Sequence, residues 1–148
     1  MTEERHPDTN ELMEQLFKAT SLERFLSTYE SSCLNIGISD YLTSWCKARQ
    51  AVPEHIIRKA NLDKSFGHQL FSGKRKPSRD TVIRLAFAMD ATVDEAQEML
   101  KISGKSPLYP RIKRDAVIIY CLHNRLGLMK TNFVLEDLDL PYLGGKDQ

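Results

Sequence analysis

The sequence predicts an all-α protein with a core of five helices and extra helices on the N-terminal and C-terminal sides. Apolar residues recur along the chain at the three- and four-residue spacing of a helix face. Capping residues precede these stretches, and Gly, Asn or Pro follows them. With 148 residues, 41% hydrophobic and 28% charged, the composition is that of a folded globular protein.

The first segment, residues 1–37, is predicted to be a helical extension. Thr9 or Asn10 is expected to cap a helix with Leu12, Met13, Leu16 and Phe17 on one side, and Ser21 to cap a second, shorter one. Neither helix carries a chemical motif. We interpret the extension as a packing or dimerisation element.

The second segment, residues 38–104, is predicted to contain the five central helices. Ser39 is expected to cap the first, and Pro53 suits the first turn of the next, where its missing N–H costs nothing. Asn61 can adopt the left-handed conformation that ends that helix, and Asp63 can cap a further one from Lys64 to Phe71. The two helices on either side of Asn61 therefore form a predicted helix-turn-helix.

The end of the central segment has equally clear start and stop signals. Gly73 ends the helix that Asp63 begins, and Ser78 is expected to cap the next. Thr92 and Glu95 have the spacing of a capping box at the start of the fifth helix, which Gly104 ends.

The last segment, residues 105–148, is predicted to be a helical hairpin and tail. A helix over 111–124 is expected to bury Ile112 and Tyr120 within a broad apolar surface. Gly127 interrupts it, and a final helix over 128–138 offers Phe133 and Leu135 for burial.

The central segment resembles the xenobiotic-response-element family of helix-turn-helix regulators, which have the lambda-repressor-like fold. The resemblance rests on Leu70 with the run Gly73-Lys74-Arg75-Lys76-Pro77-Ser78, on Leu85-Ala86, and on the capped run Thr92-Val93-Asp94-Glu95-Ala96. It implies a sequence-specific DNA-binding transcriptional regulator with double-stranded DNA as its partner, and it covers under half of the chain.

Four positions depart from the family pattern. The family usually has a small residue where Ile57 stands, a branched apolar residue where Gly67 stands, and Gly where Asn61 stands. We interpret Ile57 and Gly67 as a size exchange across one helix contact, which preserves the filled volume. Pro53 replaces a polar residue that often contacts a DNA phosphate, so part of the usual backbone anchoring is missing.

The DNA-reading face is predicted from the charge pattern of residues 58–79. The net charge is only +1, but basic residues outnumber acids in this stretch. A helix in the major groove needs polar side chains near its N-terminal end and flanking cations for the phosphates. The candidates for base contact are Lys64, Ser65, His68 and Gln69. The candidates for phosphate contact are Lys74, Arg75, Lys76 and Arg79.

A non-catalytic adaptor that keeps the fold without binding DNA is the alternative, favoured by the low net charge, Pro53 and Gly67. No enzyme motif is present, and we expect no cofactor, no metal site and no small-molecule ligand. Cys33, Cys46 and Cys121 lack metal-site spacing and suit a reducing cytoplasm. Without an apolar run long enough for a bilayer, no membrane contact is expected. The terminal helices are expected to mediate a homodimer, since symmetric pairing enlarges a small DNA interface.

Overall fold

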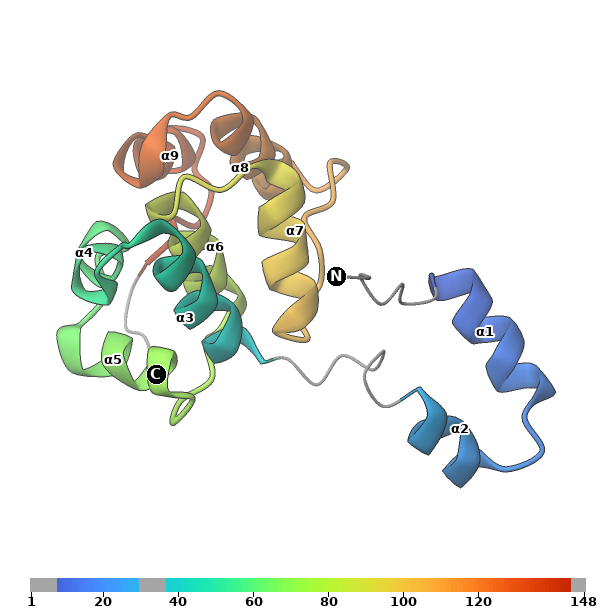
Figure 1. Cartoon of the computed structure of the whole chain (residues 1–148). Coiled ribbons are helices and arrows are strands. Elements are labelled where there is room, and N and C mark those ends of the chain that lie inside the picture. Colours follow the sequence, from blue (N-terminus) through green and yellow to red (C-terminus); the bar gives the residue numbers. More distant parts are fainter. Residues whose placement is uncertain (1–7, 30–36, 145–148) are drawn as a thin grey trace. The chain divides into compact units, whose positions relative to one another are not determined.

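The computed structural model describes residues 8–29 and 37–144 and, within them, consists of helices without a strand (Figure 1). This confirms the all-α prediction. The chain divides into two compact units, Met1–Asn35 and Ile36–Gln148. The predicted segments 38–104 and 105–148 thus lie together in the second unit.

The first unit is a pair of short helices that buries none of its described side chains. It contains α1 (Thr9–Lys18) and α2 (Leu22–Thr28). Ser21 caps α2 by accepting a hydrogen bond from the Arg24 N–H at 3.3 Å, which confirms that prediction. The cap of α1 is Asp8, not Thr9 or Asn10, and its carboxylate accepts from the Glu11 N–H at 2.8 Å.

The second unit contains seven helices in its described part. They are α3 (Ile38–Arg49), α4 (Pro53–Lys59), α5 (Lys64–Ser72), α6 (Arg79–Ala88), α7 (Val93–Ile102), α8 (Lys113–His123) and α9 (Gly127–Asp137). The predicted caps Asp63, Ser78 and Thr92 all accept the expected backbone N–H, and Glu95 completes the capping box. Ser39 is not a cap, because α3 begins one residue earlier at Ile38.

The centre of this unit is α6, which is buried from Thr81 to Ala88 and packs against α4, α7 and α9 (Figure 1). Val82, Ile83 and Leu85 are completely enclosed. Burial of each such side chain stabilises the fold by about 1.5 to 3 kcal/mol. The five helices of residues 38–104 and the two that follow therefore share one hydrophobic core.

Two straps attach the C-terminal segment to this core. The Gln97 amide on α7 exchanges two hydrogen bonds, both 2.8 Å, with the backbone of Leu108. The Asn132 amide on α9 makes the same pair with the backbone of Leu143, at 2.7 and 2.6 Å. Leu108 and Leu143 are both buried, so each strap holds an apolar side chain in the core.

The buried faces of α8 and α9 agree only in part with the predicted ones. In α8 the buried side chains are Asp115, Ile118, Cys121 and Leu122. Ile112 and Tyr120 are more than half exposed, as is Phe133 on α9, whereas Leu135 is buried as predicted, together with Thr131. The predicted apolar stripe was wrong because Asp115, a charged residue, occupies the face that packs on the core.

Candidate nucleic-acid interface

Helices α4 and α5 and the turn between them have the connectivity of a helix-turn-helix. Asn61 in the turn has φ +56°, which confirms the predicted left-handed stop after α4. Asp63 begins α5 by accepting from the Phe66 N–H at 3.0 Å. The turn is therefore set by local signals at both ends.

A buried arginine fastens this turn to the centre of the unit. Arg84 lies on α6 at 2% exposure, and its Nε donates to the Ala60 carbonyl at 3.0 Å. Its Nη2 donates to the Asn61 carbonyl. The guanidinium therefore satisfies carbonyls at the end of α4, where the helix dipole also favours a positive charge.

The inner side of α5 packs on α4 through Gly67. A Cβ added to Gly67 would lie 2.4, 2.7 and 2.9 Å from three side-chain carbons of Ile57, so the two helices meet too closely here for a larger residue. This contact confirms the predicted exchange of size between Ile57 and Gly67. It leaves the opposite side of α5 facing outward.

Two of the four predicted base-contact residues are engaged by α4. The Nζ atom of Lys64 lies 2.9 Å from Glu54 Oε1, and His68 Nε2 lies 3.8 Å from the same oxygen. The hydrogen bond and charge of Lys64, with a smaller contribution from His68, lower the pKa of the Glu54 carboxyl from its usual 4.5. Glu54 is therefore ionised at neutral pH and partly neutralises the N-terminal end of α5.

The other two predicted base-contact residues form a separate stripe, one helical turn apart. Ser65 is exposed and Gln69 is partly exposed. Among the described residues, neither side chain makes a hydrogen bond or ion pair. Both hydroxyl and amide groups can hydrogen-bond to base edges.

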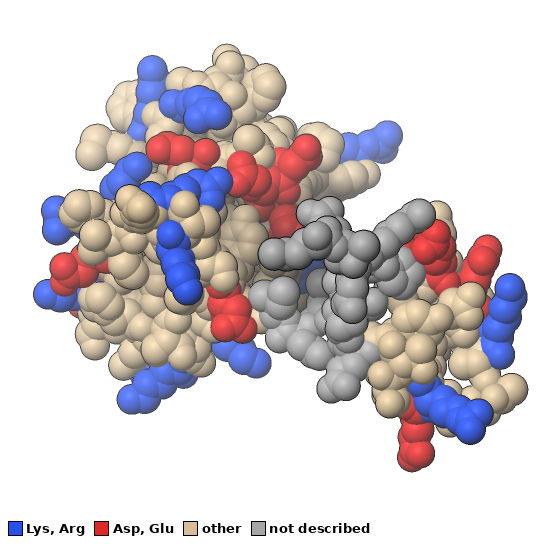
Figure 2. All heavy atoms as spheres, in the orientation of Figure 1, with Lys and Arg blue, Asp and Glu red and all other residues tan. Residues whose placement is uncertain are grey.

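The basic loop after α5 has a fixed backbone and outward side chains. Gly73 ends α5 with φ +82°, and the Arg75 N–H donates to the Gln69 carbonyl at 3.1 Å. Lys74, Arg75 and Lys76 are all exposed. Figure 2 shows Lys and Arg atoms at the edge where α5 and this loop lie and also elsewhere on the unit, and a group of Asp and Glu atoms over α7. Three exposed cations therefore follow α5 directly in the chain.

Arg79, the fourth predicted phosphate contact, is engaged in packing. Its guanidinium bonds both carboxylate oxygens of Asp115 at 2.9 and 3.2 Å and donates to the Ser106 and Pro107 carbonyls. The Asp115 side chain is only 3% exposed, and it also accepts from the Tyr109 N–H at 3.0 Å. Arg79 thus attaches the 105–115 region to α6, and we leave it out of the candidate interface.

The sequence reasoning did not identify Glu54 or Arg84. Arg84 had a usable signal, because it stands between apolar positions in the most apolar central helix, where a charged residue needs internal partners. Glu54 had none, since its position opposite Lys64 depends on how α4 and α5 pack.

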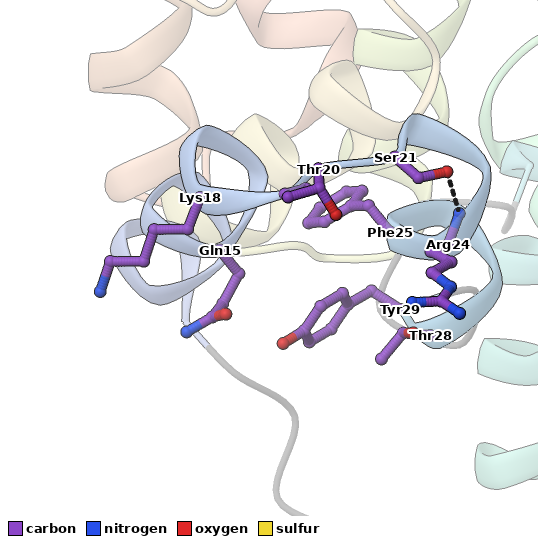
Figure 3. A pocket seen from close by; sticks show the side chains of 9 residues that line it. Gln15, Lys18, Thr20, Ser21, Arg24, Phe25, Thr28 and Tyr29 are labelled. Atoms are coloured by element: carbon purple, nitrogen blue, oxygen red, sulfur yellow. Dashed lines mark hydrogen bonds between the residues drawn. The ribbon is translucent and has the colours of Figure 1, made fainter.

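Other candidate sites are weak. A hollow of about 270 Å³ lies between α1 and α2 and includes Phe25 and Tyr29 (Figure 3). The Lys18 ammonium points away from this hollow, and the only hydrogen bond drawn among its lining residues is the Ser21 cap. The hollow therefore lacks converging polar groups that would select a ligand.

The described residues contain no group of three or more His, Cys, Asp or Glu side chains placed to hold a metal ion. Cys46 and Cys121 are buried, and burial raises the pKa of the Cys46 thiol. None of the described helices is long and apolar enough to cross a bilayer.

Comparisons with protein-family models, curated proteins and solved structures gave no match.

Proposed function

We propose that this chain is a sequence-specific DNA-binding regulator of the lambda-repressor-like class. In this proposal α5 enters the major groove, where Ser65 and Gln69 read base edges and Lys64 and His68 lie at the same face. Lys74, Arg75 and Lys76 bind phosphates. The observation that supports it best is the exposed polar stripe of α5 placed next to three exposed cations whose backbone is tied to α5.

The salt dependence of binding tests the phosphate contacts. We expect log K for a mixed-sequence duplex to fall linearly with log salt, by about 0.9 per phosphate contact. Three contacts therefore give a slope of about −2.7. Arg75→Ala should weaken binding to all duplexes alike, and Arg111→Ala, which removes another exposed arginine, should leave it unchanged. Absence of binding by the wild type at low salt would favour the adaptor alternative.

Sequence reading is tested separately with Gln69. Selection of bound fragments from a random duplex library should enrich one motif for the wild type. Gln69→Ala should lose preference at one base position of that motif, because a bidentate amide contact discriminates against a wrong base by about 1 to 3 kcal/mol. Identical enriched motifs for both proteins would remove Gln69 from the reading set.

Pairing of two copies through the terminal helices is the second part of the proposal. The helices α1 and α2 bury no described side chain, and Phe17 on α1 is 79% exposed. Two short helices without a core gain stability from packing against another surface. The Phe17→Ser variant changes α1, and the Phe133→Ser variant makes the same substitution at an exposed position of α9. Sedimentation of the two variants should show which of them lowers the fraction of dimer and therefore which end mediates pairing. A monomeric wild type at the concentrations used for DNA binding would contradict the pairing.

A further inference from the structure

We infer that Glu54 restrains the recognition helix from binding DNA phosphates, so that sequence-independent affinity comes from the basic loop alone. The inference rests on the proposed function and concerns how the same surface of α5 and the basic loop binds duplex DNA. It is carried by the position of one carboxylate oxygen, which lies 2.9 Å from Lys64 Nζ and 3.8 Å from His68 Nε2.

Glu54 and Lys64 lie close together because each stands in the first turn of one of two adjacent helices. Glu54 is the second residue of α4, and Lys64 is the first residue of α5. His68 follows Lys64 by one turn, so both cationic or protonatable side chains lie on one stripe of α5. The close approach of Ile57 and Gly67 brings that stripe to Glu54.

The pair adds little to the stability of the fold. Lys64 and Glu54 keep side-chain exposures of 76% and 44%. Exposed ion pairs contribute little to stability, because solvent screens them and ordering two long side chains costs entropy. Its main consequence is for the charge that an approaching ligand meets.

A phosphate that approaches this end of α5 meets a carboxylate as well as a cation. Whether the Lys64 ammonium keeps Glu54 or leaves it when it binds the phosphate, the carboxylate remains nearby and repels the phosphate. The preceding residue, Pro53, has no N–H to donate to that phosphate. By contrast, Lys74, Arg75 and Lys76 have no carboxylate partner among the described residues.

Restricting phosphate contacts in this way weakens the binding of every duplex by a similar factor. Phosphate contacts raise affinity for every duplex equally, whereas base contacts raise it for one sequence. The Glu54 carboxylate repels phosphates and so lowers the affinity for DNA of any sequence, without contacting Ser65 or Gln69. Glu54 thus sets the strength of sequence-independent binding and does not itself read a base.

The test is the binding of Glu54→Gln to a mixed-sequence duplex, measured by fluorescence anisotropy over a range of salt concentrations. Glutamine keeps the size and removes the charge. We expect about fivefold tighter binding at low salt, from one elementary charge about 4 Å from a phosphate in water. The slope of log K against log salt should become steeper by about 0.9, because Lys64 gains a phosphate contact.

Two control variants isolate the cause. Glu98→Gln removes the same charge from the exposed side of α7 and should leave the slope unchanged. In a Lys64→Met background, Glu54→Gln should no longer steepen the slope, because the released cation is absent. Thermal unfolding of Glu54→Gln should agree with the wild type within about 2 °C.

The outcomes separate this inference from the proposed function. If Arg75→Ala weakens binding and Glu54→Gln leaves it unchanged, Glu54 is no restraint and the inference fails, while DNA binding stands. Weaker binding of Glu54→Gln would mean that the carboxylate itself contacts a base, as with a cytosine amino group, and would also overturn it. If neither the wild type nor Glu54→Gln binds at low salt, both proposals are wrong.

Discussion

Arg79, Arg84 and Arg114 lie in contacts between helices, whereas Lys74, Arg75 and Lys76 extend into solvent beside α5. Arg114 bonds both carboxylate oxygens of Asp80, at 3.0 and 2.9 Å, and the Pro141 carbonyl at 2.8 Å. Each inward arginine therefore joins segments far apart in sequence. The comparison separates cations that hold the fold from cations that can meet a ligand, and Arg79 shows that the two kinds can lie three residues apart in sequence.

The largest expected effect among the inward arginines comes from removing Asp115, the carboxylate partner of Arg79. Asp115→Ala leaves the Arg79 guanidinium without its carboxylate in a largely shielded place and should cost about 3 to 5 kcal/mol in unfolding free energy. Urea denaturation measures it. Asp137→Ala, which removes an exposed acid at the end of α9, should change stability by less than about 0.5 kcal/mol. A loss below about 1 kcal/mol for Asp115→Ala would mean that the shielded pair is no anchor.

The apolar contact between α4 and α5 gives a reference for the charged anchors. Ile57→Ala should cost about 2 to 5 kcal/mol, like other large-to-small core substitutions. In that background Gly67→Val should recover part of the loss, because the removed side chain is the one that blocks a Cβ at Gly67. The same Gly67→Val change in the wild type should be destabilising. Equal effects of Gly67→Val in both backgrounds would contradict the contact.

Arg84 tests whether the turn depends on an arginine inside the core. Arg84→Met keeps an apolar stem of similar length and leaves the Ala60 and Asn61 carbonyls without that donor, for which we expect a loss of about 2 to 4 kcal/mol. Arg58→Met, at an exposed position of α4, is the matched control and should be nearly neutral. If both variants unfold at the same urea concentration, the buried guanidinium does not stabilise the turn.

The smallest expected effect is on the exposed ion pair between Lys64 and Glu54. The pKa of Glu54 should lie below 4.5 because Lys64 stabilises its ionised form. The pair therefore contributes its stabilisation above that pH and loses it as the pH falls through the lowered pKa. Carboxyl NMR titration of the wild type and Lys64→Met measures this. The midpoint should rise in Lys64→Met, and equal midpoints would contradict the pairing in solution.

Local signals predicted much of the fold. Ser21, Asp63, Ser78 and Thr92 were identified as caps because each accepts a backbone N–H only three residues away, a relation visible in the sequence. Asn61 and Gly73 were identified as helix ends for similar reasons. The size exchange of Ile57 and Gly67 was predicted only with the help of the family resemblance.

Long-range partners could not be predicted. Arg79 looked like part of the basic loop, but its carboxylate partner is 36 positions away. The same Asp115 reversed the expected buried face of α8, since a paired carboxylate can occupy a position that periodicity assigns to an apolar residue. At the candidate interface, Lys64 and His68 were placed on the right helix, but their engagement with Glu54 depends on packing between helices.

The strap between Asn132 and Leu143 also bears on how the chain acquires its fold during synthesis. Leu143 lies in the core, and α9, which packs on α6, holds it there. The ribosome makes α5 long before it adds this leucine, at about 5 to 20 residues per second. The nascent chain thus carries its basic loop for several seconds before the core is closed, and completion of folding waits for the last described residues.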